Sequence, residues 1–394
     1  DANIPFWNRP CPDPMPRQVV PETGMGATAR ASLKLFAVRE LPIVARDEYR
    51  QQLWDVAHSV LSEGKLRVVL VIGEAGSGKT AVVESVVRDL EEGGWAETIE
   101  LSHQKPPGKE DGYAGAARAL IRPWNENRAS LTARLRRNLA RARGMLDGVV
   151  YEESDMLARW CGLLHEEEDP VPAGYGLREV YRFLEARSWR GLSCLVIDNA
   201  HWAVEDGDGL AIAEAMLQTR SEGADKRLLV LVTIRAEDLS KDPDLAERID
   251  HLIEDGAERL DLPRLDRKGT EILLHESLTL VPEIATKVAE RCEGNPLFAR
   301  QLLIEWSDRG WLVDTGGLQF GLAPGVNVDA VMPADAEALF LERVEALAVA
   351  SGQPRRFRDT LAMAALAGIT IPKDLLHALA GTELAAFFRG CGLW

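Results

Sequence analysis

The sequence has few cysteines, no long apolar run and a shortage of positive charge, and each of these absences excludes a class of protein. The five cysteines are scattered and form no C-x-x-C pair, which argues against a disulfide framework or a cysteine-rich zinc site and favours a reducing compartment. No run of about 18 apolar residues is present, so we expect no transmembrane helix. No signal peptide is visible. We therefore predict a cytoplasmic protein without a membrane partner.

The charge balance is acidic. Lys and Arg number 46 against 62 Asp and Glu, which gives a formal net charge of −16. Proteins that bind nucleic acid through bulk charge need clustered cations, so nucleic acid is not the expected partner. One local exception is a group of arginines on a predicted helix, which indicates either an anionic partner or a solvated face balanced by Glu152 and Glu153: Arg134, Arg136, Arg137, Arg141 and Arg143.

The length and patterning indicate more than one globular domain. The 394 residues are 46% apolar and 27% charged, typical of a chain with real cores and two or three domains. The first residues are rich in proline and predict an extended linker or a disordered tail. The chain begins at Asp1 rather than Met, and its last residues, 388–394, stop in mid-pattern, so we expect a fragment of a longer protein.

Short apolar runs alternate with helical patterns over residues 46–234. This alternation predicts a parallel α/β sheet, with strands at 67–73, 98–101, 192–198 and 227–234 and helices at 46–61, 80–90 and 209–219. Strand signals become scarce after about residue 256. There the patterns predict helices at 266–280, 282–292 and 296–309, a hairpin at 313–320 and further helix at 333–390.

A glycine-rich loop between the first strand and the next helix matches the P-loop pattern G-x-x-x-x-G-K-[ST]. Its glycines let several backbone N–H groups point at one polyphosphate, and the following helix presents its positive end. We predict that it binds ATP or ADP with Mg²⁺; Lys79 would bridge the β- and γ-phosphates and the Thr80 hydroxyl would bind the metal. The predicted nucleotide-binding residues here are Gly73, Glu74, Ala75, Gly76, Ser77, Gly78, Lys79, Thr80 and Ala81.

Three further residues are predicted to act on the phosphates. Asp198 closes an apolar strand, where a carboxylate would hold Mg²⁺ together with Thr80. Asn199 follows it and cannot accept a proton, so we expect slow hydrolysis, unless another acid such as Glu74 supplies the base. Arg235 follows the strand 227–234 and is either a γ-phosphate sensor or a solvated strand end. The pair His201-Trp202 is interpreted as packing rather than chemistry.

Four motifs together resemble the STAND NTPases, signal-transduction ATPases with numerous domains within the wider AAA+ class. They are Val44-Ala45-Arg46-Asp47-Glu48, similar to V-G-R-E; the P-loop; Asp198-Asn199-Ala200-His201-Trp202, similar to D-D-x-H-W; and Gly294-Asn295-Pro296, similar to G-x-P. Ala45 and Asn199 depart from the family's pattern. The resemblance covers about residues 33–394.

The resemblance implies a domain order, and we predict a linker at 1–32, a nucleotide-binding domain at 33–255 with strand order 5-1-4-3-2, a helical lid at 256–312 and a truncated winged helix at 313–394. It implies that Val44 and Arg46 flank the adenine, that Pro296 packs against it and that Arg235 is the sensor. It gives no role to His377.

In function, the resemblance implies a slow ATPase that acts as a switch. ADP would hold the module closed; ATP would let it self-associate and control an attached effector, with an unknown trigger, in prokaryotic signalling or defence against phage. The alternative is an AAA+ ATPase that binds DNA through its winged helix. Arg355, Arg356 and Arg358 lie there, but acids such as Glu342 and Glu345 precede them.

Overall fold

The computed structural model describes most of the chain. The described residues are 11–15, 43–105, 111–121, 127–143, separate positions within 154–161 and 175–184, and 191–203, 209–218, 227–316, 319–366 and 373–390. The bulk of the predicted linker 1–32, Glu152 and Glu153 fall outside them. None of the helices in these ranges is long and apolar enough to cross a membrane.

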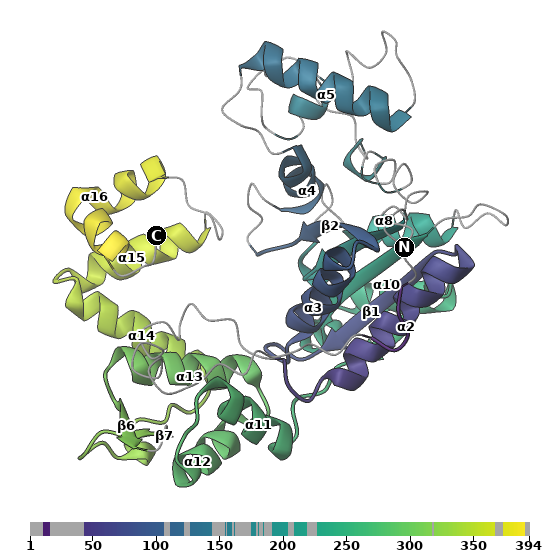
Figure 1. The fold of residues 1–394 in the computed structure, drawn as a ribbon. Helices are drawn as coiled ribbons and strands as arrows, with labels where there is room; N and C mark the ends of the chain where they lie inside the picture. The colour runs from purple at the N-terminus through teal and green to yellow at the C-terminus, as the bar shows by residue number, and fades with distance from the viewer. Residues whose placement is uncertain are drawn as a thin grey trace.

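A five-stranded parallel sheet forms the first part of the molecule (Figure 1). Its strand order is β2-β3-β4-β1-β5, which is the predicted order 5-1-4-3-2 read from the other edge. The strands are β1 (Arg67–Gly73), β2 (Ala96–Ser102), β3 (Leu192–Asp198), β4 (Leu228–Arg235) and β5 (Glu258–Asp261). The three central strands β3, β4 and β1 are buried almost throughout, because helices cover both faces of the sheet.

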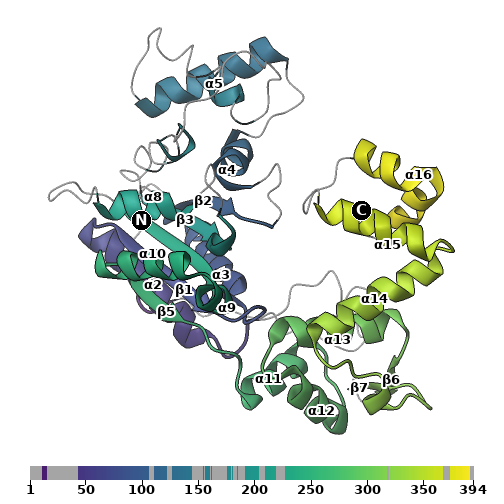
Figure 2. The ribbon, with the colours of Figure 1, turned by 180° about the vertical axis from the view of Figure 1, so that it is seen from behind.

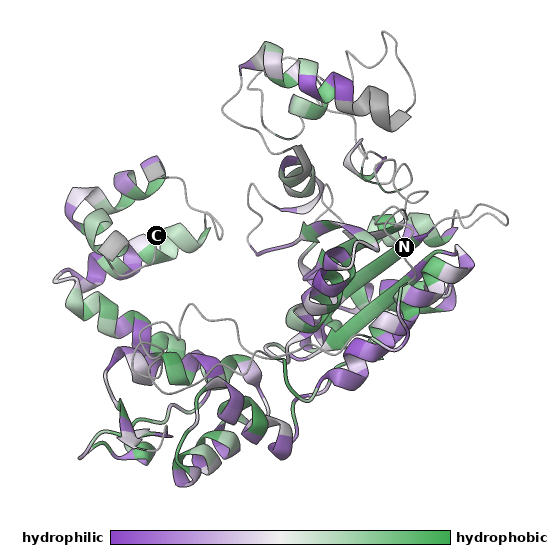
Figure 3. Cartoon of the chain, in the orientation of Figure 1, coloured by the Kyte–Doolittle hydropathy of each residue, from purple (hydrophilic) through white to green (hydrophobic). Residues whose placement is uncertain are grey.

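Helices α2 (Asp47–Glu63) and α3 (Lys79–Glu92) pack on one face through residues such as Trp54 and Val83. Helices α4 (Gly112–Ile121), α8 (Gly209–Gln218) and α10 (Pro243–Glu254) pack on the other. Figure 3 shows the strands coloured mostly hydrophobic, between helices of mixed hydrophobic and hydrophilic colour. Arg50 also ties α2 to α3, because its guanidinium donates to Ser85 Oγ at 3.0 Å and to Asp89 Oδ2 at 2.8 Å.

The elements of this part that were not predicted from the sequence include β5, α4, α9 (Ala236–Lys241) and α10. Strand β5 reads Glu-Arg-Leu-Asp and has a single apolar residue, Leu260. It lies at the edge of the sheet and pairs only with β1, so burial imposes little apolar patterning on it. The short helix α9 follows β4 directly and precedes α10.

Residues 11–15, inside the predicted linker, pack along α2. The indole Nε1–H of Trp54 donates to Pro12 O at 2.8 Å, and Gln51 Oε1 accepts from the Met15 N–H at 3.1 Å. Cys11 and Met15 lie against the apolar cluster of α2 and α3. This stretch is therefore docked on α2 rather than a free tail.

The second part of the chain has a hydrophobic core of its own, built by α11 (Arg267–Ser277), α12 (Pro282–Cys292), α13 (Pro296–Asp308) and the antiparallel hairpin β6 (Leu312–Gly316) and β7 (Gln319–Leu322). Its largest buried side chain is Trp306. We call this the second core. The predicted helices and hairpin of this region are confirmed.

Helices α14 (Ala336–Ala350), α15 (Pro354–Leu366) and α16 (Lys373–Gly390) build a third core around Phe357 and Phe388, whose rings stack at 4.8 Å. Figure 2 shows α14 running up from α13 of the second core, with α15 and α16 at its upper end, away from the hairpin β6–β7. Helix α5 (Arg128–Arg143), which carries the arginine group, lies beyond α4.

Candidate functional site

The P-loop joins the end of β1 to the start of α3, as predicted. Gly76 has a φ of 77°, a left-handed conformation that favours glycine. The Lys79 ammonium is buried and donates to Gly73 O and Glu74 O, each at 2.8 Å. Burial, reinforced by Arg235, lowers the pKa of Lys79, while nearby acids led by Glu237 oppose that shift. The loop thus surrounds one desolvated cation.

Asp198 lies beside the P-loop at the end of β3. Its Oδ1 accepts from Thr80 Oγ1 at 2.9 Å and from Thr233 Oγ1 at 2.6 Å, and its Oδ2 accepts from Asn199 Nδ2 at 3.1 Å. Only 8% of Asp198 is exposed. A carboxylate next to a hydroxyl supplies the hard oxygen donors that Mg²⁺ prefers, so these residues fit the predicted metal. Thr233 was missed; its one sequence signal is a hydroxyl inside the apolar run of β4.

Metal binding here would depend on the nucleotide. Among the described residues no group of three or more His, Cys, Asp or Glu side chains could hold a metal ion. Mg²⁺ is commonly bound by one or two protein oxygens plus phosphates and water, rather than by a cage of side chains. The Thr80–Asp198 pair fits that mode.

Asn199 has a φ of 54°, and its backbone N–H donates to Thr233 Oγ1 at 2.9 Å. The side-chain amide of Asn199 donates to Asp198, and Asn199 also lines the cavity described below. An amide can orient a water molecule but cannot take its proton.

Arg235 is the last residue of β4, and its guanidinium lies over the Trp202 ring at 4.1 Å from the centroid. The His201 side chain is fully buried; its Nδ1 accepts from the Arg235 N–H at 3.4 Å and its Nε2 lies 3.5 Å from Asp238 Oδ2. Burial, with the nearby charges of Arg235 and Lys79, lowers the pKa of His201 to about 4. This geometry agrees with the packing interpretation of His201 and Trp202, which together hold Arg235 at the strand end.

A cavity of about 530 Å³ opens above the P-loop. It collects residues from four places: the segment before α2, the loop with α3, the ends of β3 and β4, and the second core. Among the predicted site residues it is lined by Val44, Arg46, Gly76, Ser77, Gly78, Lys79, Thr80, Ala81, Asn199, Arg235 and Pro296. Sequence reasoning missed Arg88, Leu265, Leu273, Leu297 and Arg300, which also line it. Arg300 stands four residues after Pro296 on α13, a helical spacing that could have revealed it.

The second core touches the P-loop directly. Asn295 Nδ2 donates to Ala75 O at 3.2 Å, and its Oδ1 accepts from the Phe298 N–H as the N-cap of α13. A Cβ on Gly294 (φ 75°) would stand 2.0 Å from Leu265 O, so only glycine fits there. Residues 294–296 therefore lie against the P-loop.

Arg46 makes a second link, because its buried guanidinium donates to Ser77 O at 3.0 Å and to Pro263 O at 2.6 Å. It therefore joins the P-loop to the segment that leads from β5 into α11. Burial lowers the pKa of Arg46.

Two further acids lie at the P-loop: Glu74, within the loop, and Glu237, on α9. Glu74 Oε2 accepts from Arg264 Nε at 2.6 Å in a partly exposed ion pair. Glu237, on α9, accepts instead from the Ala75 N–H at 2.9 Å.

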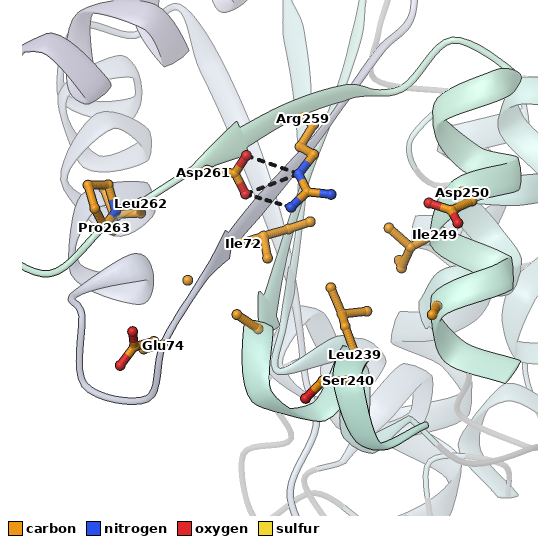
Figure 4. Close-up of a pocket in the computed structure, with 13 residues that line it drawn as sticks. Ile72, Glu74, Leu239, Ser240, Ile249, Asp250, Arg259, Asp261, Leu262 and Pro263 are labelled. Carbon is orange, nitrogen blue, oxygen red and sulfur yellow. Dashed lines mark hydrogen bonds and ion pairs between the residues drawn. The ribbon is translucent and has the colours of Figure 1, made fainter. Parts of the chain in front are cut away.

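A second cavity of about 510 Å³ lies between β1, β5, α9 and α10 (Figure 4). Gly73 and Glu74 border this cavity and not the first. Apolar side chains such as Ile72 and Ile249 face it, and Arg259 is held there by Asp261 through bonds of 2.9 and 3.0 Å.

A parallel sheet of order 5-1-4-3-2 whose first strand ends in this loop defines the chain as a P-loop NTPase. More specifically, residues 42–232 match the family model described as AAA ATPase domain, just under half of the chain. No curated protein sequence matches the chain.

Several solved structures are similar in fold. A chain of the Drosophila ORC bound to DNA shares 14% identity with a TM-score of 0.46, and the match covers 97% of this chain and 84% of that one. The Aeropyrum pernix ORC2 protein, in ADPNP-ADP complexes, shares 13% identity with a TM-score of 0.45, and the match covers 91% of this chain and 89% of that one. A Walker-type ATPase of Pyrococcus abyssi shares 15% identity with a TM-score of 0.41, and the match covers 90% of this chain and 93% of that one. These values are too low to transfer the relatives' functions. The expectation that nucleic acid is not a partner has no support among them.

Proposed function

We propose that the chain is the nucleotide-gated switch of a STAND-type protein. Bound ADP holds the sheet, the helical lid predicted at 256–312 and the winged helix predicted at 313–394 in a closed monomer. Exchange for ATP with Mg²⁺ releases the closed form, and the module then self-associates and controls an attached effector. The four motifs support this assignment, and with it a cytoplasmic role in prokaryotic signalling or defence against phage, under an unknown trigger.

The observation that carries the proposal is the composition of the cavity above the P-loop. Gly76 and Lys79 belong to the sheet part, whereas Leu273, Pro296 and Arg300 belong to the second core. A ligand in this cavity contacts both parts at once. Its affinity therefore depends on how the two parts are arranged, which is what a ligand-driven shift between two states requires.

The chain's own residues have distinct tasks in this scheme. Lys79 and the amides of residues 76–81 bind the phosphates, Thr80 and Asp198 hold Mg²⁺, and Arg235 contacts the terminal phosphate. The metal, when bound, neutralises charge on the β- and γ-phosphates. Asn199 orients the attacking water without accepting its proton, so hydrolysis is slow and the ATP state lasts.

Sedimentation of the full chain tests the proposal. We expect a monomer with ADP and a higher-mass species with Mg²⁺ and a non-hydrolysable ATP analogue. Lys79→Ala should stay monomeric with ADP and with the ATP analogue. Lys65→Ala, at an exposed lysine just after α2, should behave as the wild type. A sedimentation mass that is the same with ADP and with the ATP analogue, at every protein concentration tested, contradicts the switch.

The second candidate is an AAA+ ATPase that binds DNA through the winged helix predicted at 313–394. One observation favours it: Arg355 and Arg356 are exposed on α15. Against it, the neighbouring Arg358 is held by Glu345 in a two-bond ion pair, at 2.8 and 2.9 Å. Binding to a duplex that weakens steeply with salt and is lost in Arg355→Glu would favour this candidate.

A further inference from the structure

Glu237 joins the helix after β4 to the tip of the P-loop. Its Oε1 accepts the 2.9 Å hydrogen bond from the Ala75 N–H. Its other oxygen, Oε2, is buried and has no hydrogen-bond partner among the described residues. A carboxylate can accept about four hydrogen bonds, so this group is held on the loop while one of its oxygens is unsatisfied. A contact of this kind is readily given up for a better one.

The Glu237 carboxylate is ionised and lies among the cations of the site. Burial alone raises its pKa, but the Ala75 amide, its own amide, Lys79 and Arg235 together hold the pKa below its ordinary value. In return, Glu237 is the first of the acids that raise the pKa of Lys79. The lysine of a P-loop reaches the β- and γ-phosphates. Glu237 thus already balances part of the charge that a terminal phosphate would use.

The position of the Ala75–Glu237 contact lets it respond differently to a diphosphate and to a triphosphate. The cavity is lined by residues 76–82 of the loop and α3, while Ala75 and Glu237 are not among its lining residues. A diphosphate seated on the amides that line the cavity leaves the Ala75–Glu237 bond in place. A third phosphate adds negative charge beside Lys79 and Arg235, where it meets the ionised carboxylate, and like charges repel strongly when partly desolvated.

We propose that Glu237 determines the preference between nucleoside diphosphate and triphosphate: it stays on the Ala75 amide when ADP is bound and must be displaced when ATP binds. This inference rests on the proposed function, since a switch between two nucleotide states needs a residue that responds to the terminal phosphate. Displacement of Glu237 also frees α9 from the loop, which gives the sheet part a local change that reports ATP.

Titration calorimetry on the full chain, with Mg²⁺ and either ADP or a non-hydrolysable ATP analogue, tests the inference. Glu237→Gln keeps an oxygen that can accept from Ala75 and removes the charge, so the loop keeps its geometry. We expect the affinity for the ATP analogue to rise about tenfold relative to ADP, within the usual range of coupling between sites. ADP affinity should not change.

Two further variants complete the design. Glu237→Ala, which removes the hydrogen bond as well, should shift the ratio in the same direction and serves if Glu237→Gln does not fold. Glu247→Gln removes an equal charge from the exposed face of α10 and should leave the ratio at the wild-type value. Equal changes in both affinities would show that Glu237 only shapes the loop, and an unchanged ratio would show no role; either result overturns the inference. The ratio is measured without assembly, so a failure of the switch itself appears separately, as an unchanged sedimentation mass.

Discussion

Thr80 and Asp198 are joined by a 2.9 Å hydrogen bond between the hydroxyl and Oδ1, although they stand 118 residues apart in the chain. The bond connects the start of α3 to the end of β3. In a P-loop NTPase these two oxygens face the same metal. Thr233 donates to the same Oδ1 from β4, so three neighbouring elements fix the carboxylate before any nucleotide arrives.

Asp198→Asn should remove the benefit of magnesium for ATP binding. The amide keeps the size of the side chain but loses the charge that attracts the metal. We expect the affinity for ATP in wild type to be raised by Mg²⁺ and that of the variant to be nearly the same in Mg²⁺ and in EDTA, by calorimetry. Asp255→Asn, at an exposed position after α10, is the control. A full magnesium effect in Asp198→Asn would remove this residue from the metal site.

Lys79→Ala should reduce ATP affinity roughly hundredfold or more, because charge-assisted hydrogen bonds to phosphate are worth about 1.5–3 kcal/mol each. The Lys79 ammonium is buried and already desolvated, and its removal takes away the cation that would reach the β- and γ-phosphates. Calorimetry measures the loss, with Lys65→Ala as the control. Unchanged affinity would remove the P-loop from the binding site.

Asn199→Asp should speed ATP hydrolysis if the missing carboxylate limits the reaction. The left-handed φ of 54° is tolerated by Asp about as well as by Asn, so the fold should be kept. We expect a rise of about hundredfold, the lower end of the range for a positioned base, measured as phosphate release. An unchanged rate would mean that another group acts as the base, and Glu74 would then be tested by Glu74→Gln.

Much of the fold follows from the sequence because burial leaves a pattern. Strands β1, β3 and β4 are covered on both faces, so they read as continuous apolar runs, and Gly73 and Asp198 mark where two of them end. Strand β5 leaves no such pattern, since three of its four residues are exposed. Its place beside β1 is set by backbone hydrogen bonds, and its side chains give no sequence pattern from which that pairing could be predicted.

The candidate site was predictable to the same extent. The residues within each motif are contiguous in the sequence. The strand order then brings Thr80, Asp198 and Arg235, from three separate segments, to one edge of the sheet. Glu237 and Asn295 were not assigned roles, because their contacts with Ala75 join segments 162 and 220 residues apart. Such contacts depend on how the elements pack. Local spacing carries no information about them.

The buried His201 should make the protein less stable in acid. Its pKa is about 4 in the folded state against an ordinary 6.5, so the unfolded chain binds a proton that the folded chain does not. The sign follows: stability is full above pH 6.5 and falls as the pH drops toward 4, by about 3 kcal/mol in total.

Urea unfolding at pH 7.5 and pH 5 compares wild type with His201→Gln, which does not titrate. The carboxylates contribute equally to both proteins, so the difference between the two pH slopes isolates the histidine. We expect a smaller loss of stability in His201→Gln than in wild type. Equal losses would show that His201 is not buried in its neutral form.

Asn295 offers a direct test of whether the second core retains the nucleotide. Asn295→Ser keeps an oxygen that can cap α13 but is too short to donate to Ala75 O, whereas Asn295→Ala loses both bonds. A hydrogen bond of this kind contributes about 0.5–1.5 kcal/mol, so both variants should release fluorescent ADP about twofold to tenfold faster in stopped-flow measurements. Only the alanine variant should also lose about 1 kcal/mol of unfolding free energy, as caps do. ADP release at the wild-type rate in Asn295→Ser would mean that the contact between the second core and the P-loop does not hold the nucleotide.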